Sequence, residues 1–263
     1  MRLLSLAAIL AVMLVLAVVE TVVPFHRREG SRQPRAGTNV ALTLLTLALN
    51  VALTTLLAAG AELSRSRGLL APLDLAPWMY VVVALVLPDF STYVAHRLMH
   101  RVPALWRVHL VHHCGPHLDV STSYRQHPIE GLVRFVFILG PAMALVLPLY
   151  AIGAYRLVSA LNGLLEHVNV RLWQPLDSLL SLGVVTPNMH KVHHSRRREE
   201  TDSNYGNLFS LFDRVLGTFT PSRRVADVVY GIAGHDAPEQ QRLGRLFPLP
   251  FRAMRSEGPG EVV

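Results

Sequence analysis

The chain has 263 residues, of which 51% are hydrophobic and only 16% are charged. Its mean hydropathy of +0.34 is too apolar for an ordinary soluble fold and indicates a membrane protein. The net charge of +7 does not point to nucleic acid, because arginines that flank apolar segments are also favoured beside anionic lipid. The one cysteine, Cys114, excludes an internal disulfide and agrees with a reducing compartment.

Three segments, residues 3–23, 39–60 and 75–95, are apolar enough to cross a bilayer, which takes about 20 residues. A signal peptide is the alternative for the first segment. Its apolar run is long for that purpose, and no small-residue cleavage pattern follows it, so we expect a retained helix. The arginine-rich loop over residues 26–35 is expected in the cytoplasm, which places the chain after Ala95 on the cytoplasmic side.

A fourth apolar stretch, residues 132–168, is interrupted by Gly140, Pro141, Pro148 and Gly153. Glycine and proline bend or end a helix, so we predict a bent hairpin of two helices here. Such a hairpin returns the chain to the side that it left.

Thirteen histidines are many for this length, and most of them cluster. His96 and His100 continue the third span, and their i, i+4 spacing puts them on one helical face. An i, i+3, i+4 spacing then occurs twice, in His109, His112 and His113 and in His190, His193 and His194. We expect the first triad on a helix between Pro103 and Gly115, and the second on a helix that begins at Pro187.

Imidazole is the commonest metal ligand in proteins, and a zinc site usually takes four ligands, so eight clustered histidines suggest two metal ions. The zinc peptidase pattern H-E-x-x-H is absent, because Arg97 follows His96 and no glutamate lies before His100. The sequence therefore predicts an all-α polytopic membrane protein, with a cytoplasmic histidine-rich helical cap that holds a di-metal site.

Four stretches carry a family resemblance: "DFSTYVAHRLMH", "LWRVHLVHH", "EHVNV" and "HKVHHS...DSNYGNLFSLFDRVLGTF". Over roughly residues 89–219 the chain resembles the fatty acid hydroxylase and sterol desaturase superfamily of integral-membrane di-iron enzymes. With this resemblance we expect transmembrane anchor helices over residues 1–74, a catalytic domain over 75–220 and a cytoplasmic tail over 221–263. We expect the tail to be loose beyond Arg252.

The resemblance implies two iron ions held mainly by the histidines of the three boxes: His96, His100, His109, His112, His113, His190, His193 and His194. It also implies further ligands between the second and third boxes, for which His167 and His127 are the candidates. Asp89 lies seven residues before His96, on the same helical face, and is expected to orient ligand rings. Glu166 and Asp202 are further candidates for that role.

The implied activity is oxygen-dependent hydroxylation, or desaturation, of a membrane lipid such as a sterol, a fatty acyl chain or an ether lipid. The sequence contains neither a cysteine-rich ferredoxin pattern nor a dinucleotide fingerprint. Electrons are therefore expected from a separate reductase, ferredoxin or cytochrome. We expect the protein in the plasma (inner) membrane. The alternative is a histidine-rich divalent-metal-binding protein or transporter without redox chemistry, which would carry ionisable residues within its spans.

Two surface features complete the predictions. Arg196, Arg197 and Arg198 are expected at the lipid headgroup level, and a role in binding an acidic substrate headgroup remains open. Trp106 and Trp173 are expected to pack near the histidine helices at the membrane interface.

Overall fold

The computed structural model describes residues 3–27, 33–63, 75–235 and 237–252. Within these ranges the chain forms helices and no β-strand, and an isolated antiparallel bridge joins Ser195 to Tyr230. The prediction of an all-α protein is confirmed. The α-helices are α1 (Leu3–Val22), α2 (Gln33–Leu63), α3 (Pro77–Arg101), α4 (Pro103–His113), α5 (Pro128–Leu145), α6 (Leu149–His167), α7 (Gln174–Leu180), α8 (Pro187–His193), α9 (Arg198–Thr201), α10 (Leu211–Val215) and α11 (Leu243–Leu246).

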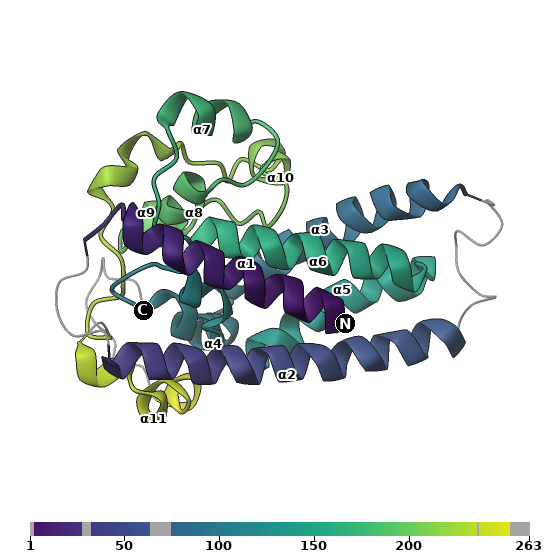
Figure 1. Cartoon of the computed structure of the whole chain (residues 1–263), viewed down its shortest axis with the longest axis horizontal. Helices are drawn as coiled ribbons and strands as arrows, with labels where there is room; N and C mark the ends of the chain where they lie inside the picture. Colours follow the sequence, from purple (N-terminus) through teal and green to yellow (C-terminus); the bar gives the residue numbers. More distant parts are fainter. Residues whose placement is uncertain (1–2, 28–32, 64–74, 236, 253–263) are drawn as a thin grey trace.

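Five long helices, α1, α2, α3, α5 and α6, lie side by side, and the shorter helices α4, α8, α9 and α11 gather towards one end of this bundle (Figure 1). Four segments of the described chain are long and apolar enough to cross a membrane: Leu4–Val22, Gly37–Gly60, Pro77–Arg101 and Pro128–Leu145. Because each of them exceeds or approaches the length that a bilayer requires, the chain is an integral membrane protein, as predicted.

The predicted hairpin is present as α5 and α6, but single helix-breaking residues do not explain its bend. The turn follows α5 at Val146, which adopts a left-handed conformation with φ 48°, and Pro148 then caps the start of α6. Pro141 and Gly153 lie inside the two helices. A membrane helix tolerates an interior proline when neighbouring helices pack around it, so the chain turns only where the backbone leaves the helical region.

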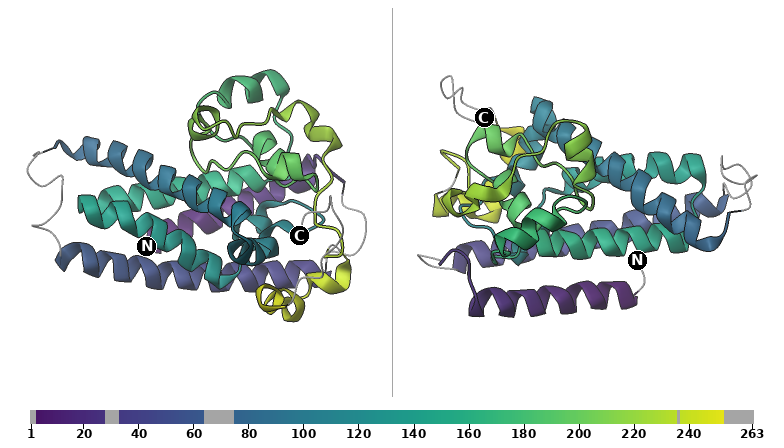
Figure 2. Two further views of the ribbon diagram at one scale, coloured as in Figure 1. Left: turned by 180° about the vertical axis from the view of Figure 1, so that it is seen from behind. Right: turned by 90° about the horizontal axis from the view of Figure 1, so that it is seen from above.

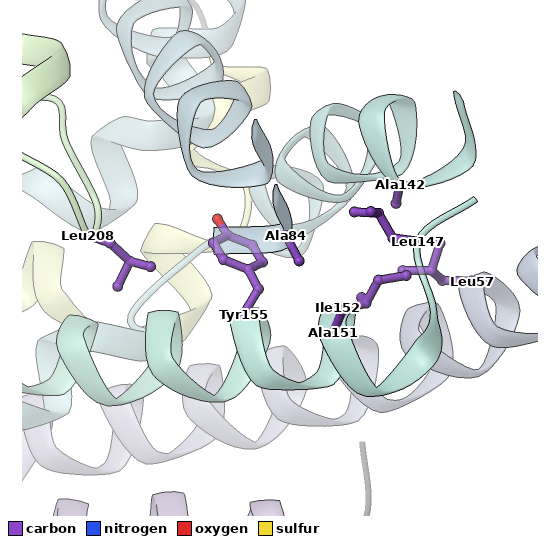
Figure 3. Packing of buried hydrophobic residues seen from close by; sticks show 8 residues of the cluster. All are labelled: Leu57, Ala84, Ala142, Leu147, Ala151, Ile152, Tyr155 and Leu208. Atoms are coloured by element: carbon purple, nitrogen blue, oxygen red, sulfur yellow. The ribbon is translucent and has the colours of Figure 1, made fainter. Parts of the chain in front are cut away.

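The end of the bundle away from the histidines is closed by small and aliphatic side chains (Figure 3). Ala84 of α3, Ala142 of α5 and Ala151 of α6 are fully buried there, and small residues let helix backbones approach closely in a membrane. Tyr155 belongs to the same cluster, and its hydroxyl lies 2.8 Å from Oγ1 of Thr92 on α3. This packing fixes α6 against α3.

Helix α1 lies on the outside of the bundle (Figure 2). Its Ile9 packs in one cluster with Val120 of the 3₁₀ helix η2 (Val120–Tyr124) and with Leu164 of α6. Near its C-terminal end, the buried Glu20 carboxylate accepts hydrogen bonds from the backbone N–H groups of Val120 (3.0 Å) and Asn169 (3.1 Å). The last turn of this helix is therefore tied to the segment that follows α6.

The segment after α1 and the C-terminal segment meet at the histidine end of the bundle. The backbone N–H of His26 donates to Asn169 Oδ1 at 3.0 Å, and its ring lies edge-on to Tyr230, with centroids 5.4 Å apart. The 3₁₀ helices of the C-terminal segment are η3 (Ser222–Asp227), η4 (Pro238–Gln241) and η5 (Leu249–Phe251); η3 packs on α8 and η5 on α4. The predicted loose end beyond Arg252 lies outside the described residues.

Candidate metal centre

Local sequence signals place the two histidine triads on short helices. Helix α4 begins at Pro103 and ends at His113, as its flanking prolines and glycine predict. Helix α8 begins at Pro187 after the N-cap residue Thr186, whose side-chain oxygen accepts a hydrogen bond from the backbone N–H of Met189 at 3.2 Å. Both helices present their histidines to the buried side, where they meet the last turns of α3 and α6.

Nine buried histidines form two groups, and within each group the ligating nitrogens lie within 4.8 Å of one another. We define group one as His96, His100, His109, His113 and His193. We define group two as His112, His167, His190 and His194. The structure thus brings together the eight histidines of the three boxes and His167. The two groups adjoin each other, because the rings of His113 and His194 stack with centroids 4.4 Å apart.

Each triad is divided between the two groups, although its spacing alone suggested one shared face. The i and i+4 residues join one group and the i+3 residue joins the other, as in His109, His113 and His112 of α4 and His190, His194 and His193 of the α8 segment. Consecutive residues are rotated by about 100° around a helix axis, so adjacent histidines point to different neighbours. One short helix therefore contributes to both groups.

The spacing of the histidine nitrogens fits metal coordination. Five pairs of Nε2 atoms within the groups face each other at 3.1 to 3.2 Å, including His96 with His109 and His190 with His167. Two nitrogens that each lie about 2.1 Å from one ion are separated by about 3.0 to 3.4 Å. The Nε2 atoms of His100 and His193 are buried without a partner in the described chain. Metal ions would satisfy these nitrogens.

The opposite ring nitrogen is held by the protein in several ligands. Three Nδ1 atoms contact backbone carbonyl oxygens: His96 with Tyr205 at 2.9 Å, His193 with Ser203 at 2.7 Å and His167 with Gly163 at 2.6 Å. A carbonyl oxygen only accepts, so these rings carry their proton on Nδ1 and leave the Nε2 lone pair free for a metal ion. The backbone thereby selects both the tautomer and the orientation of the ring.

One buried carboxylate supports group one directly. Oε1 of Glu130 lies 3.0 Å from Nδ1 of His109 and 3.0 Å from Nε of Arg134. Glu130 is fully buried in the first turn of α5 and links a candidate metal ligand to a cation. The sequence reasoning missed this residue. The signal that could have found it is a lone glutamate two residues after Pro128, in the first turn of a largely apolar helix.

Two of the carboxylates suggested by the sequence also approach histidine rings. Glu166 Oε2 lies 3.8 Å from Nδ1 of His190, and Asp202 Oδ1 lies 3.6 Å from Nδ1 of His100. Both distances exceed a direct hydrogen bond. These acids therefore place carboxyl groups beside the two groups of histidines without fixing the ring orientation themselves.

Asp89 contacts no histidine ring and instead holds a loop. Its carboxylate accepts hydrogen bonds from the backbone N–H groups of Leu208 (3.1 Å) and Phe209 (3.0 Å). The same loop contains Tyr205, whose carbonyl oxygen receives Nδ1 of His96. Asp89 is thus positioned to support a ligand ring through this loop, rather than through the direct contact that its place on α3 suggested.

A second carboxylate, that of Asp213, clamps the other side of the loop. It accepts the backbone N–H groups of Tyr205 and Gly206, each at 2.8 Å, and burial raises its pKa to about 6. A Cβ atom on Gly206 would lie 2.8 Å from the carbonyl oxygen of Phe209, so only glycine fits. The "NYGN" stretch, residues 204–207, is therefore a carboxylate-clamped support for group one.

His127 lies outside both groups. Its Nδ1 accepts a hydrogen bond from the backbone N–H of Ile129 at 3.2 Å, which caps the start of α5. Its Nε2 lies 3.2 Å from the carbonyl oxygen of Phe247 in the C-terminal segment. Because both ring nitrogens are used by the protein, we do not assign His127 to the metal centre.

The two tryptophans expected near the histidine helices differ. The Trp106 ring packs on His100, His109 and His113, with centroids 5.0, 6.3 and 5.6 Å apart, so the prediction for this residue is confirmed. Trp173 precedes α7 and is 71% exposed, so it does not pack on the histidine rings. Its neighbour Leu172 is hydrogen-bonded to Asn188 of α8, and the position of Trp173 at the membrane interface stays a prediction.

Burial keeps the histidines neutral. It lowers the pKa of His193 from 6.5 to about 4, against the opposing effect of the contact with the Ser203 carbonyl. Burial also holds the pKa values of His109 and His113 well below 6.5, and neighbouring imidazoles add to the effect. Neutral imidazole is the form that binds a metal ion, so the site is in its ligating state at pH 7.

A cavity inside the bundle reaches both histidine groups. It has about 1130 Å³ of space between its atoms, including its opening to the outside, and is lined mainly from α1, α2, α3, α5, α6 and η2. At one end it touches His96 of group one and His112, His167 and His190 of group two. A molecule in this central cavity would therefore contact both groups.

These features define an integral-membrane protein with two adjacent polyhistidine groups at the end of an internal cavity. The chain belongs to the fatty acid hydroxylase family, because the family model matches residues 81–218, just over half of the chain. The predicted superfamily is thereby confirmed. The match covers all nine grouped histidines and ends just before the C-terminal segment.

Several relatives share this region. The chain is 38% identical over 162 residues to ornithine lipid hydroxylase OlsE of Rhizobium tropici, covering 59% of this chain and 46% of that protein. It is 29% identical over 169 residues to alkylglycerol monooxygenase of Caenorhabditis elegans (61% and 31%). It is 26% identical over 150 residues to lathosterol oxidase of Mus musculus (54% and 46%). The chain thus matches less than half the length of each relative. No solved structure gives a significant match.

Proposed function

We propose that this chain is a di-iron oxygenase that uses dioxygen to hydroxylate, or to desaturate, a membrane lipid. The observation that carries the proposal is that two groups of neutral histidines line one end of a cavity within a membrane-spanning bundle. The names of the relatives support it, since each describes oxidation of a lipid. Sterols, fatty acyl chains and ether lipids are the substrate classes that follow from the family.

Group one would hold one iron and group two the other, through the Nε2 atoms that face each other. A pair of irons supplies the means to reduce dioxygen and to oxidise an unactivated C–H bond. Hydroxylation places one oxygen atom in the lipid and releases the other as water, so it consumes two electrons and two protons. We assign the electrons to a separate reductase, ferredoxin or cytochrome.

The chain's own residues prepare the site. Carbonyl oxygens hold the Nδ1 protons of His96, His167 and His193, so their Nε2 lone pairs stay directed inward. Glu130 places a carboxyl oxygen next to the His109 ring and pairs with Arg134. Burial of all nine rings excludes water, which protects reactive species from side reactions. The central cavity then holds the lipid against both groups.

We further propose that the histidine end faces the cytoplasm, in the plasma (inner) membrane. Its support is the segment after α1: His26 lies at this end, beside Asn169 and Tyr230, and it opens an arginine-rich loop of the kind favoured in the cytoplasm. In this arrangement residues 1–74 are the anchor, 75–220 the catalytic domain and 221–263 the cytoplasmic tail. The anchor also supports the site, because Glu20 binds the backbone beside α6.

A divalent-metal transporter, the alternative class, is not favoured. Transport would require ligands along a path across the bilayer. The nine grouped histidines instead come from the last turns of α3 and α6, from α4 and from the α8 segment, which meet towards one end of the described bundle. The named relatives act by oxidation, which agrees with a fixed metal centre.

The direct test is oxygen incorporation. Cells that express the wild-type chain under ¹⁸O₂ should accumulate one altered lipid class, found by mass spectrometry of extracted lipids: hydroxylation adds one ¹⁸O atom, and desaturation removes two hydrogen atoms. A His193→Ala variant, expressed to the same level, should show neither change. The same lipids in both strains would overturn the proposal. Arg245→Gln, which alters an exposed arginine on α11, serves as the matched control and should label like the wild type.

A further inference from the structure

The central cavity contains an arginine without a counter-ion. Arg156 of α6 lines the cavity, and one Nη2–H donates to Asn50 Oδ1 of α2 at 3.0 Å. Its Nε is buried and has no partner, and no acidic side chain pairs with it in the part of the chain that the structure describes. Arg134, in the same cavity, differs, because Oε1 of Glu130 lies 3.0 Å from its Nε.

The position of Arg156 makes its lone charge significant. Its partner Asn50 lies near the middle of the membrane-spanning segment Gly37–Gly60. Charged side chains at such depth are rare in membrane proteins, and they pair with another group or mark a ligand path. Asn50 supplies an amide oxygen but no charge, so the guanidinium still needs an anion.

A second unsatisfied donor lies on the same cavity. Tyr124 of η2 is only 8% exposed, and its hydroxyl is buried without a partner. Burial raises the pKa of Tyr124 to about 12, while the nearby Arg156 opposes that shift, so the hydroxyl remains a donor at neutral pH. Two residues from separate elements, each with an unpaired buried donor, thus line one cavity, and a buried donor left unpaired is costly.

The geometry of α6 sets the distance from this site to the histidines. Arg156 precedes His167 on α6 by eleven residues, which is about 16 Å along the helix axis. The cavity runs from one residue to the other, since both line it. A ligand with its head at Arg156 can therefore extend an alkyl chain along α6 to the two histidine groups.

We propose that Arg156, together with Tyr124 and Asn50, binds the acidic oxyanion of a single-chain lipid, a carboxylate or a phosphate, and directs its chain towards the histidine groups. This inference rests on the proposed function, whose substrate class it narrows. An oxyanion accepts hydrogen bonds from both unsatisfied donors and supplies the missing charge. A neutral sterol or alcohol supplies no charge.

The test measures binding rather than turnover. Purified metal-loaded protein in a neutral detergent is titrated with hexadecanoate, hexadecyl phosphate and hexadecanol, which compete with a fluorescent fatty-acid probe. The wild type should bind at least one of the two acids about tenfold more tightly than the alcohol, and the better acid identifies the head group. Equal affinity for the acids and the alcohol would overturn the proposal.

Variants test whether the preference for acids over the alcohol comes from Arg156. Arg156→Gln should weaken acid binding about tenfold and change alcohol binding less than about twofold, whereas Arg156→Lys keeps the charge and part of the affinity. Arg245→Gln is the control of equal charge change and should bind like the wild type. Equal weakening for acid and alcohol in Arg156→Gln, with its thermal midpoint and iron content preserved, would contradict the inference.

If Arg156→Gln fails to fold, the test uses Tyr124→Phe instead. This variant removes one hydroxyl group and keeps the aromatic ring. It should weaken acid binding by about threefold or more and leave the alcohol unchanged. If Tyr124→Phe binds the acid as tightly as the wild type does, the inference is overturned. Failure of the proposed function is recognised separately, by the absence of both ¹⁸O-labelled and newly desaturated lipid, since selective acid binding does not depend on turnover.

Discussion

The two histidine groups come from the same spacing but have different surroundings. In group one, His96 and His193 are anchored to carbonyl oxygens of the segment 203–205, which is clamped by a buried carboxylate, and Trp106 covers one side. Group two has more contact with the central cavity, because three of its four rings line it, whereas His96 alone does so in group one. The difference indicates that a molecule in the cavity would lie mainly against group two.

The largest effect is expected from removing a ligand of either group. His193→Ala in group one and His167→Ala in group two should each reduce ¹⁸O incorporation at least about hundredfold, because both metals are needed for the chemistry. The assay is lipid mass spectrometry at matched protein levels. If one of the variants kept near wild-type activity, its group would be dispensable and the two-metal account would be wrong.

Glu130→Gln should cost roughly 10- to 100-fold in metal affinity or activity. The change removes the negative charge beside His109 and leaves Arg134 without its ion-pair partner. Iron release into a chelator, followed over time, measures the loss. Glu199→Gln, on the exposed part of α9, is the control and should release iron at the wild-type rate. The same rate for Glu130→Gln would argue that the carboxylate has no role in metal retention.

Asp89→Asn should destabilise the loop that supports group one. The amide can present an N–H to the backbone donors of Leu208 and Phe209, and each unpaired donor costs about 1 to 3 kcal/mol. We expect a lower thermal midpoint and faster release of iron from group one. Iron in group two should be released later. Asp227→Asn, an exposed residue in η3, should leave both values unchanged. An unchanged midpoint in Asp89→Asn would remove the link between this carboxylate and the metal centre.

The metal-free protein should lose stability in acid. The folded pKa of His193, about 4, lies below the ordinary value of 6.5, so the unfolded chain binds more protons between these pH values. The contribution of the buried histidine to stability should be constant above about pH 7 and fall as the pH drops from 6.5 towards 4. Thermal midpoints of chelator-treated protein across this range test the sign. A midpoint that rises as the pH falls would show that the rings are not buried in the neutral state.

The smallest effect is expected at His127. Its ring caps α5 and contacts the carbonyl oxygen of Phe247, so His127→Ala should cost about 0.5 to 2 kcal/mol of stability. The iron content should stay at the wild-type value. Loss of an iron ion in this variant would restore His127 as a ligand and change the membership of the two groups.

The sequence was informative wherever a local signal decides the structure. Proline starts and histidine spacing located α4 and α8, because both signals act within one or two helical turns. The spacing did not reveal which group each ring joins, since that depends on how α3, α4, α6 and α8 are oriented to one another. The place of His167 in group two likewise depends on how α6 is oriented to α4 and α8.

Supporting residues were harder to predict because their partners are distant in the chain. Asp89 was selected for its helical face, yet its partners are backbone groups about 120 positions away. Arg156 and Asn50 pair across 106 positions, and neither stands out within its own apolar segment as part of a site. Glu130 reaches His109 only because α5 packs back onto α4. Such contacts follow from packing, which no short pattern encodes.

The central claim, one metal ion for each histidine group, is tested most directly by metal content. Detergent-purified wild type, His193→Ala and His167→Ala are analysed by mass spectrometry at matched purity and compared per chain. The account predicts about two irons in the wild type and at least about one fewer in each variant. No stoichiometric metal in the wild type, or an unchanged content in both variants, would contradict it.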